Sequence, residues 1–237
     1  MRVLLPPYSL VITGVVLLAS VSAGVAAAST RNDALACVDD ATRLLQQIAM
    51  DPQGGIPEEV TDAVKCLAVV LHLRKRRFGS NALRGRGIVS CRNLDAWGPP
   101  AFFVLSDGYS LTPSGVKDKS FIIMVMDQQS RQLLSSKKIE IGTDVSGIGG
   151  PIGRHVSPQN YYRLNRQMLT YSISKGHLAS VSLDGATIRE DRSSLEAIYS
   201  RGAGTEAVLS GRLPVPATAR SFVAAVSEIV QSPRVSD

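Results

Sequence analysis

The chain has 237 residues, of which 44% are hydrophobic, and its 26 Lys and Arg outnumber its 20 Asp and Glu to give a formal net charge of +6 at pH 7. This length excludes a chain too small to bury a hydrophobic core and suits one large domain or two small ones. The mild positive charge suits an acidic partner, such as an anionic lipid surface, but does not require one.

The N-terminal segment predicts export from the cytoplasm. Residues 3–30 contain no charged side chain, and Arg2 supplies the only positive charge ahead of the apolar run at residues 10–19. Three consecutive alanines that end at Ala28 match the small-residue pattern of a signal-peptidase site. We therefore predict cleavage after Ala28.

This segment also sets the predicted domain boundaries and location. Residues 1–28 are the predicted signal peptide, and residues 29–237 the predicted single domain, with a core at about residues 56–231. An uncleaved membrane anchor is the alternative, because ~20 apolar residues are enough to span a bilayer. Both interpretations predict an exported protein of the periplasm or cell envelope.

The predicted elements begin with helices and continue with strands. Apolar residues recur at three- and four-residue spacing over residues 31–50, which predicts an amphipathic helix. Pro57 favours a second, short helix that runs to about Lys65. Period-two or short apolar runs then predict strands at residues 67–71, 87–91, 102–105, 121–126, 168–174 and 178–183.

Three further helices complete the prediction, at residues 128–136, 191–199 and 217–230. Helices therefore lie at both ends of a strand-rich middle, and no long alternation of strand and helix is present. This order predicts an α+β fold with a largely antiparallel sheet flanked by N- and C-terminal helices.

The predicted mature chain has three cysteines, Cys37, Cys66 and Cys91. In an exported protein two of them should pair. We predict a Cys66–Cys91 disulfide, which in the chain-entropy description would contribute ~3 kcal/mol, with Cys37 as a buried helix residue. Zinc binding is the alternative, although the cysteines lack the C-x-x-C spacing and a nearby histidine. We predict no metal and no cofactor.

A basic segment is the strongest candidate for a binding site. Seven cations and no acid lie between positions 74 and 92. Such a cluster can neutralise lipid phosphates, at ~1 kcal/mol for each cation near an anionic surface. A solvated loop rim is the alternative. The predicted lipid-binding residues are Arg74, Lys75, Arg76, Arg77, Phe78, Arg84 and Arg86.

Two short motifs carry weaker signals. Ser172 and Lys175 have the S-x-x-K spacing of penicillin-binding enzymes, but that chemistry needs both residues at the start of a helix, and residues 171–176 have a strand-like sequence. The Gly-rich residues 147–154 resemble a phosphate cradle, but Pro151 argues against the helix that should follow. We predict a turn there, with close approach of neighbouring chain segments.

An ordered set of segments resembles the SYLF domain, a module of bacterial exported proteins and of eukaryotic actin-patch, SH3-containing and FYVE proteins. The resemblance begins at Ile56 and Pro57 and closes with Tyr199 and residues 207–211. Between them it passes through residues 85–92, 97–102, 141–144, 150–154, 171–176 and 181–185.

The resemblance implies a function as well as a fold. The family has no established catalytic residues, and its eukaryotic members are described as binding phosphoinositides and, in yeast, actin filaments. The bacterial exported members are similar to this chain in having a cysteine before the first strand and another near Arg92, which supports pairing of Cys66 with Cys91. The resemblance implies a lipid- or membrane-associated binding module.

We therefore predict a non-catalytic, exported module that binds anionic, phosphoinositide-like lipid at the bacterial cell envelope. The first alternative is an interaction scaffold whose basic rim docks an acidic envelope protein. The remote alternative is a hydrolase that uses Ser172 and Lys175. Export removes nucleic acid and actin from the expected partners.

Overall fold

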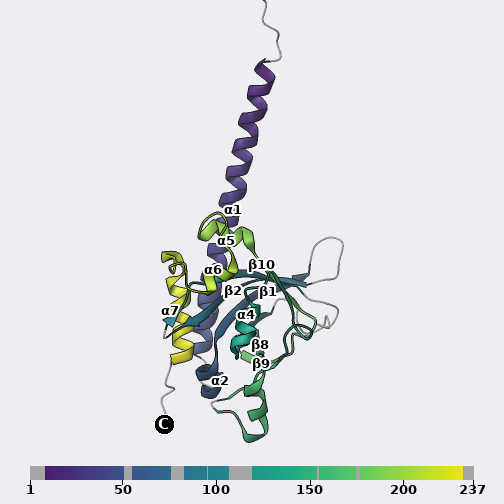
Figure 1. Ribbon diagram of the computed structural model, residues 1–237, viewed down its shortest axis with the longest axis vertical. Coiled ribbons are helices and arrows are strands. Elements are labelled where there is room, and N and C mark those ends of the chain that lie inside the picture. The colour runs from purple at the N-terminus through teal and green to yellow at the C-terminus, as the bar shows by residue number, and fades with distance from the viewer. Residues whose placement is uncertain are drawn as a thin grey trace, which may run out of the picture.

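Figure 1 shows a computed structural model of the protein, a curled sheet with helices packed along it. The structure describes residues 9–50, 55–75, 83–94, 96–106, 119–153, 155–174 and 177–231. The predicted residues Arg76, Arg77, Phe78 and Lys175 lie outside these ranges. Helix α1 (Ser9–Ala49) enters the molecule from one end, and its first part extends beyond the rest of the fold. Within the described part of the chain, no helix has both the length and the apolar character needed to cross a membrane.

The described strands form one sheet in the order β6-β10-β4-β2-β1-β5-β8-β7, with β3 and β9 paired to β2 and β8. Every pair of strands is antiparallel except β7 with β8. The strands are β1 (Cys66–Lys75), β2 (Leu83–Asn93), β3 (Ala96–Trp97), β4 (Ala101–Ser106), β5 (Ser120–Val125), β6 (Lys138–Glu140), β7 (Gly147–Gly149), β8 (Met168–Ser174), β9 (His177–Ser180) and β10 (Thr187–Glu190).

The central strands are buried on both faces, which explains their uninterrupted apolar sequences. All six residues of β5 are buried, as are residues 66–71 of β1. One face of the sheet carries Ile88 and packs against α1. We call this the helix-covered face. The opposite, inner face carries Phe103, whose ring lies where a side chain at Gly87 on β2 would stand.

The terminal helices pack on each other along the helix-covered face. Helix α7 (Arg220–Gln231) contacts α1, and the pair buries Leu45 and Ile48 from α1 and Phe222 and Val226 from α7. The predicted amphipathic patterns of both helices are thus confirmed. The remaining helices are α2 (Glu58–Ala63), α4 (Gln128–Leu133), α5 (Arg192–Ile198), α6 (Thr205–Leu209), η1 (Pro158–Asn165) and η2 (Ala217–Ala219).

The α+β prediction is confirmed, and the differences from it are local. The first helix begins at Ser9 rather than at residue 31, because residues 9–30 contain no proline or charged side chain to end it. Residues 147–149 of the Gly-rich segment form the parallel strand β7 rather than a turn. The expected close approach there is confirmed, since a side chain at Gly150 would collide with the Tyr171 ring.

Candidate functional site

The structure describes only part of the predicted lipid-binding segment. Arg84 and Arg86 are exposed residues of β2, two positions apart and therefore on the same face of the sheet. The backbones of Arg74 and Lys75 form the end of β1, where Arg74 stands opposite Arg84. The contribution of residues 76–78 remains a prediction from the sequence.

The sheet adds two cations that sequence analysis missed. In register, Arg86 on β2 is opposite Val104 on β4, Val104 is opposite Arg189 on β10, and Arg189 is opposite Lys138 on β6. Directly paired residues project from the same face, so this row crosses four adjacent strands on one side. Arg189 and Lys138 are exposed, like Arg84 and Arg86. We call Arg84, Arg86, Lys138 and Arg189 the basic face.

Two acids partly offset the charge of the basic face. Arg86 Nη1 lies 3.0 Å from Asp33 Oδ2 on α1, and Lys138 Nζ lies 3.8 Å from Glu140 Oε2. Exposed pairs of this kind contribute only about 0–1 kcal/mol, so a stronger anion can displace them. Among the described residues, Arg84 and Arg189 have no ion pair. The basic face therefore keeps cations available to a ligand.

Like charges stand next to each other on this face. Arg189 on β10 is directly opposite Lys138 on β6. A cross-strand pair of like charges is destabilising by itself. An anion with several negative oxygens would contact both cations and relieve their repulsion. The register thus favours a polyanionic surface over a single carboxylate.

Arg86 also acts on the groups around the start of α5. Partial burial acts to raise the pKa of Asp191, but hydrogen bonds from Ser193 and Ser194, with the charge of Arg86, lower that pKa below its ordinary value. Asp191 is the N-cap of α5 and accepts a hydrogen bond from the Ser194 backbone N–H. The carboxylate therefore stays ionised and holds α5 beside the basic face.

The predicted disulfide is confirmed and supports the same strands. Cys66 and Cys91 are bonded and stand directly opposite each other in β1 and β2. Cys37 is free and buried in α1, and burial raises the pKa of its thiol to about 12. A thiol that stays protonated is a poor nucleophile and a poor metal ligand. Cys37 therefore acts as a small core residue.

Ser172 does not lie where the hydrolase interpretation needs it. It is buried within β8, directly opposite Phe121 of β5. The S-x-x-K mechanism requires the serine at the start of a helix, one turn from its lysine. A serine in the middle of a buried strand lacks that geometry, so this motif gains no support from the fold.

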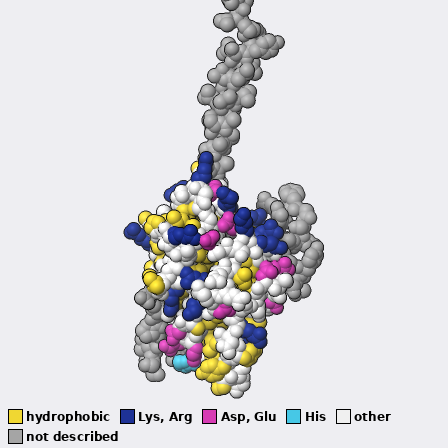
Figure 2. All heavy atoms as spheres, viewed as in Figure 1, with side chains coloured by type: hydrophobic (Ala, Val, Ile, Leu, Met, Phe, Trp, Pro, Cys, Tyr) yellow, Lys and Arg dark blue, Asp and Glu magenta, His cyan; other side chains and the backbone are white. Residues whose placement is uncertain are grey.

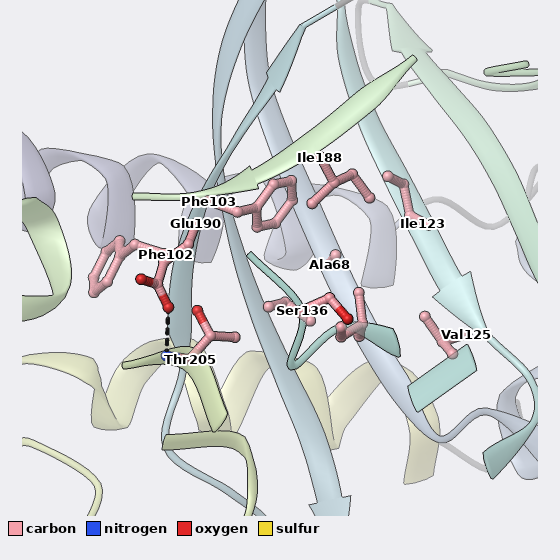
Figure 3. A pocket seen from close by; sticks show the side chains of 11 residues that line it. Ala68, Phe102, Phe103, Ile123, Val125, Ser136, Ile188, Glu190 and Thr205 are labelled. Atoms are coloured by element: carbon pink, nitrogen blue, oxygen red, sulfur yellow. Dashed lines mark hydrogen bonds between the residues drawn. The ribbon is translucent and has the colours of Figure 1, made fainter. Parts of the chain in front are cut away.

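A small cavity lies between the inner face and the residues that follow α4 (Figure 3). Its lining is largely apolar, with Phe103, Ile123 and Ile188 among the side chains, and its volume is about 20 Å³. That volume holds about one water molecule. The cavity cannot accept an acyl chain, so any lipid contact through this region must be made at the surface.

A second depression of about 510 Å³ lies on the surface around the loop that follows β6. It is lined by Asp144, Gln167 and Asp184, among others. Asp144 accepts a hydrogen bond from the Glu140 backbone N–H, and the Gln167 side chain accepts one from Ser146 N–H. These polar groups stabilise the loop itself, and their acidic character makes the depression unsuited to an anionic ligand.

A second surface feature was missed entirely by sequence analysis. Residues 150–153 and 155–166, which we call the tip, project from the end of the molecule opposite the emergence of α1 (Figure 1). Tyr161 and Tyr162 in η1 are 50% and 52% exposed, and Ile152 is 41% exposed. In the sequence, the one sign of this feature is a pair of adjacent tyrosines that follows Pro158, the first residue of η1.

Comparison with known proteins finds one matching family and several relatives. The profile of the Ysc84 family, described as "Las17-binding protein actin regulator", matches residues 112–229. The chain is 28% identical to Protein YSC84 of Saccharomyces cerevisiae over 168 residues, which cover 69% of this chain and 36% of the yeast protein.

Two further relatives match a similar share of the chain. LAS seventeen-binding protein 3 of Saccharomyces cerevisiae is 28% identical over 165 residues, or 68% of this chain and 36% of its own length. SH3 domain-containing YSC84-like protein 1 of Homo sapiens is 27% identical over 176 residues, or 72% of this chain and 50% of its own length. The chain thus spans about a third to a half of the length of these relatives.

Proposed function

The chain belongs to the Ysc84 family, the family of the SYLF domain, and from this premise we propose that it is a non-catalytic module that binds anionic lipid at the cell envelope after export. The observation that carries the proposal is the basic face. Its four exposed cations come from β2, β6 and β10 and lie on one side of the sheet, beside the emergence of α1.

The energetics of the basic face suit a lipid surface. Each cation held near an anionic bilayer contributes ~1 kcal/mol, so four of them supply enough attraction for reversible binding. Because paired strands hold the backbone at these positions, binding has to order only the side chains of the cations. The ~20 Å³ cavity of the inner face is too small for an acyl chain, and the contact that we propose for the basic face is with lipid head groups.

Export is the second part of the proposal and rests on the N-terminal sequence. The uncharged residues 3–30 and the alanines that end at Ala28 support a cleaved signal peptide. N-terminal sequencing of the protein recovered from the envelope tests this directly. A chain that begins at Ser29 is expected if the signal is cleaved after Ala28, whereas recovery of the chain from the cytoplasm with Met1 intact would contradict export.

Flotation with liposomes tests the lipid proposal, using the protein with its N-terminus as the producing cell leaves it. We expect flotation with vesicles that contain phosphatidylglycerol at low salt, and loss of flotation in the Arg84→Glu/Arg189→Glu variant. Binding to purely neutral vesicles would instead report insertion of an apolar N-terminus. Equal flotation of the variant and the wild type would overturn the proposal.

Arg43→Glu provides a matched control for each reversed charge. Arg43 is exposed on α1, ten residues beyond Asp33, which is about 15 Å along the helix. It pairs with Asp40 rather than with the basic face. We expect this variant to float like the wild type, which separates the location of the charge from the net charge of the protein.

Docking of an acidic protein is the second candidate function, favoured by the relative named for binding Las17. The same basic face would supply the contacts. A pull-down from envelope extract depleted of lipid separates the two functions. Capture that needs Arg84 and Arg189 but no lipid would favour the protein partner and contradict the lipid proposal.

A further inference from the structure

The tip concentrates exposed apolar and aromatic surface. Ile152, Tyr161 and Tyr162 are three of the five large hydrophobic side chains that are exposed in the described part of the chain. Figure 2 shows hydrophobic side chains gathered at this end of the molecule. Tyrosine is favoured at the boundary between lipid and water, because its ring is apolar and its hydroxyl is polar.

Two arginines accompany the tyrosines. The guanidinium carbons of Arg163 and Arg166 lie 5.7 Å and 5.8 Å from the centre of the Tyr162 ring. Arg166 is exposed, whereas Arg163 is partly buried and donates to the Gly149 carbonyl. Arg163 therefore fastens η1 to β7, and Arg166 remains available to a phosphate at the level of the tyrosines.

The tip is held rigidly by the rest of the fold. Gly153 N–H donates to the Gly55 carbonyl at 3.0 Å, and Val156 N–H donates to Glu59 Oε2 on α2 at 3.2 Å. At the other side, Gly150 lies directly against the buried Tyr171 ring. A fixed aromatic projection enters an interface without a large loss of conformational freedom.

Charge around the tip is divided between two sides. No acidic residue occurs from position 145 to 183, so the acids near the tip come from α2. Glu59 there pairs with His155, whose Nδ1 lies 3.4 Å away. In Figure 2 the histidine and acidic side chains lie on one side of the hydrophobic patch and a cation on the other. The side with the arginines complements an anionic surface.

The convex form of the tip favours a lipid bilayer as its partner. A projecting pair of tyrosines with Ile152 and a flanking cation fits the head-group region of a bilayer, into which such side chains insert. The basic face lies towards the opposite end of the molecule, beside α1 (Figure 1). A single flat bilayer cannot contact both ends at once.

We propose that the tip is a second membrane-contacting surface, so that one molecule joins two anionic lipid surfaces. The inference rests on the proposed lipid binding of the basic face. It assigns electrostatic attachment to one end of the molecule and interfacial insertion of Tyr161, Tyr162 and Ile152 to the other.

Vesicle clustering tests this inference, measured as light scattering when the protein with its natural N-terminus is added to phosphatidylglycerol-containing vesicles. We expect the wild type to cluster vesicles. The Tyr161→Ser/Tyr162→Ser variant should keep flotation but cluster at least about fivefold less, since it loses both interfacial rings. Leu94→Ser is the matched control, because Leu94 is 95% exposed but lies in the β2–β3 turn.

A fluorescent probe reports insertion independently. The chain has one tryptophan, Trp97, which is buried, so Tyr161→Trp adds an exposed reporter at the tip. The emission of this reporter should shift to the blue on vesicle addition and be quenched by brominated lipid.

The outcomes separate the two proposals. Flotation without clustering, or clustering that survives loss of both tyrosines, overturns the tip inference and leaves the basic-face proposal intact. Absence of flotation overturns the basic-face proposal, and the bridging inference with it. Capture of a soluble protein by the tip, with no shift of the Tyr161→Trp reporter on vesicles, would assign the tip to a protein partner and also overturn the inference.

Discussion

The basic face and the tip present positive charge in two different ways. The cations of the basic face come from β2, β6 and β10, with little exposed apolar surface among them, and meet only because the sheet aligns them. The tip is built from one continuous segment, and its arginines lie against an exposed tyrosine. The first arrangement suits long-range attraction, and the second suits short-range insertion.

This difference implies different responses to salt. Attraction between exposed charges is screened within about 10 Å at moderate ionic strength, whereas burial of apolar surface is not screened. Added salt should therefore weaken attachment through the basic face first. Four perturbations, in decreasing order of their predicted size, test whether the two regions are independent.

Removal of the disulfide should have the largest effect, a loss of stability of the whole fold. The Cys66→Ala/Cys91→Ala variant frees the unfolded chain from a loop, which in the chain-entropy description costs about 3 kcal/mol of the free energy of unfolding. Urea denaturation measures this loss. An unchanged midpoint, or no bond between these cysteines by mass spectrometry, would contradict the structure.

Two glycine substitutions should separate the regions. In Gly87→Ala the new methyl group would collide with the Phe103 ring, and in Gly150→Ala it would collide with the Tyr171 ring. Each overpacked site should cost about 2 kcal/mol in thermal or urea unfolding. Gly87→Ala should weaken flotation and Gly150→Ala should weaken clustering. Loss of the same activity in both variants would show that the basic face and the tip do not act separately.

Neutralising two cations of the basic face should weaken lipid binding by a free energy similar to the loss of stability expected for each glycine variant. Arg84→Gln/Arg189→Gln removes about 2 kcal/mol of attraction to an anionic bilayer, or about 30-fold in the partition coefficient. The tyrosine variant of the tip should keep this partition coefficient within about threefold. Sedimentation with vesicles measures both, and equal losses in the two variants would show that the regions do not act separately.

The smallest effect concerns pH. The pKa of Asp191 is lower in the folded protein than in the unfolded chain, so its ionised form stabilises the fold. That contribution is present above the ordinary pKa of about 3.9 and is lost as the pH falls through the lowered value. Asp191→Asn should cost about 1 kcal/mol or less at neutral pH, and the difference from wild type should disappear in strong acid.

Glu59, the α2 carboxylate that accepts a hydrogen bond from the tip, provides a comparison for Asp191. Partial burial acts to raise the pKa of Glu59, but hydrogen bonds from the Val156 N–H and the charge of His155 lower it. Glu59→Gln should therefore loosen the tip and reduce clustering without changing flotation. A loss of flotation in Glu59→Gln would contradict the separation of the two ends.

The sequence predicted the central strands because they are buried on both faces. Residues of β1 and β5 form uninterrupted apolar runs, and such runs can be recognised without knowing which strands lie beside them. The short strands β6, β7 and β10 were missed. Their three or four residues carry no period of their own and are fixed by pairing with longer strands.

The sequence predicted only those residues of the candidate site that lie close together in the chain. Arg84 and Arg86 belong to one basic segment and were identified from it. Arg189 lies about a hundred residues beyond Arg86 in sequence and joins it only through the register of β10 with β4, which no linear pattern contains. The tip was missed because a 3₁₀ segment lacks the helical and strand periodicities that reveal amphipathic surfaces.

Partition of the protein onto vesicles of increasing phosphatidylglycerol content is the decisive test of whether the basic face binds anionic lipid. We expect the partition coefficient to rise steeply with phosphatidylglycerol content for the wild type and for Arg43→Glu. The rise should be nearly absent for Arg84→Glu/Arg189→Glu. Curves that coincide for the wild type and the double variant would contradict the claim.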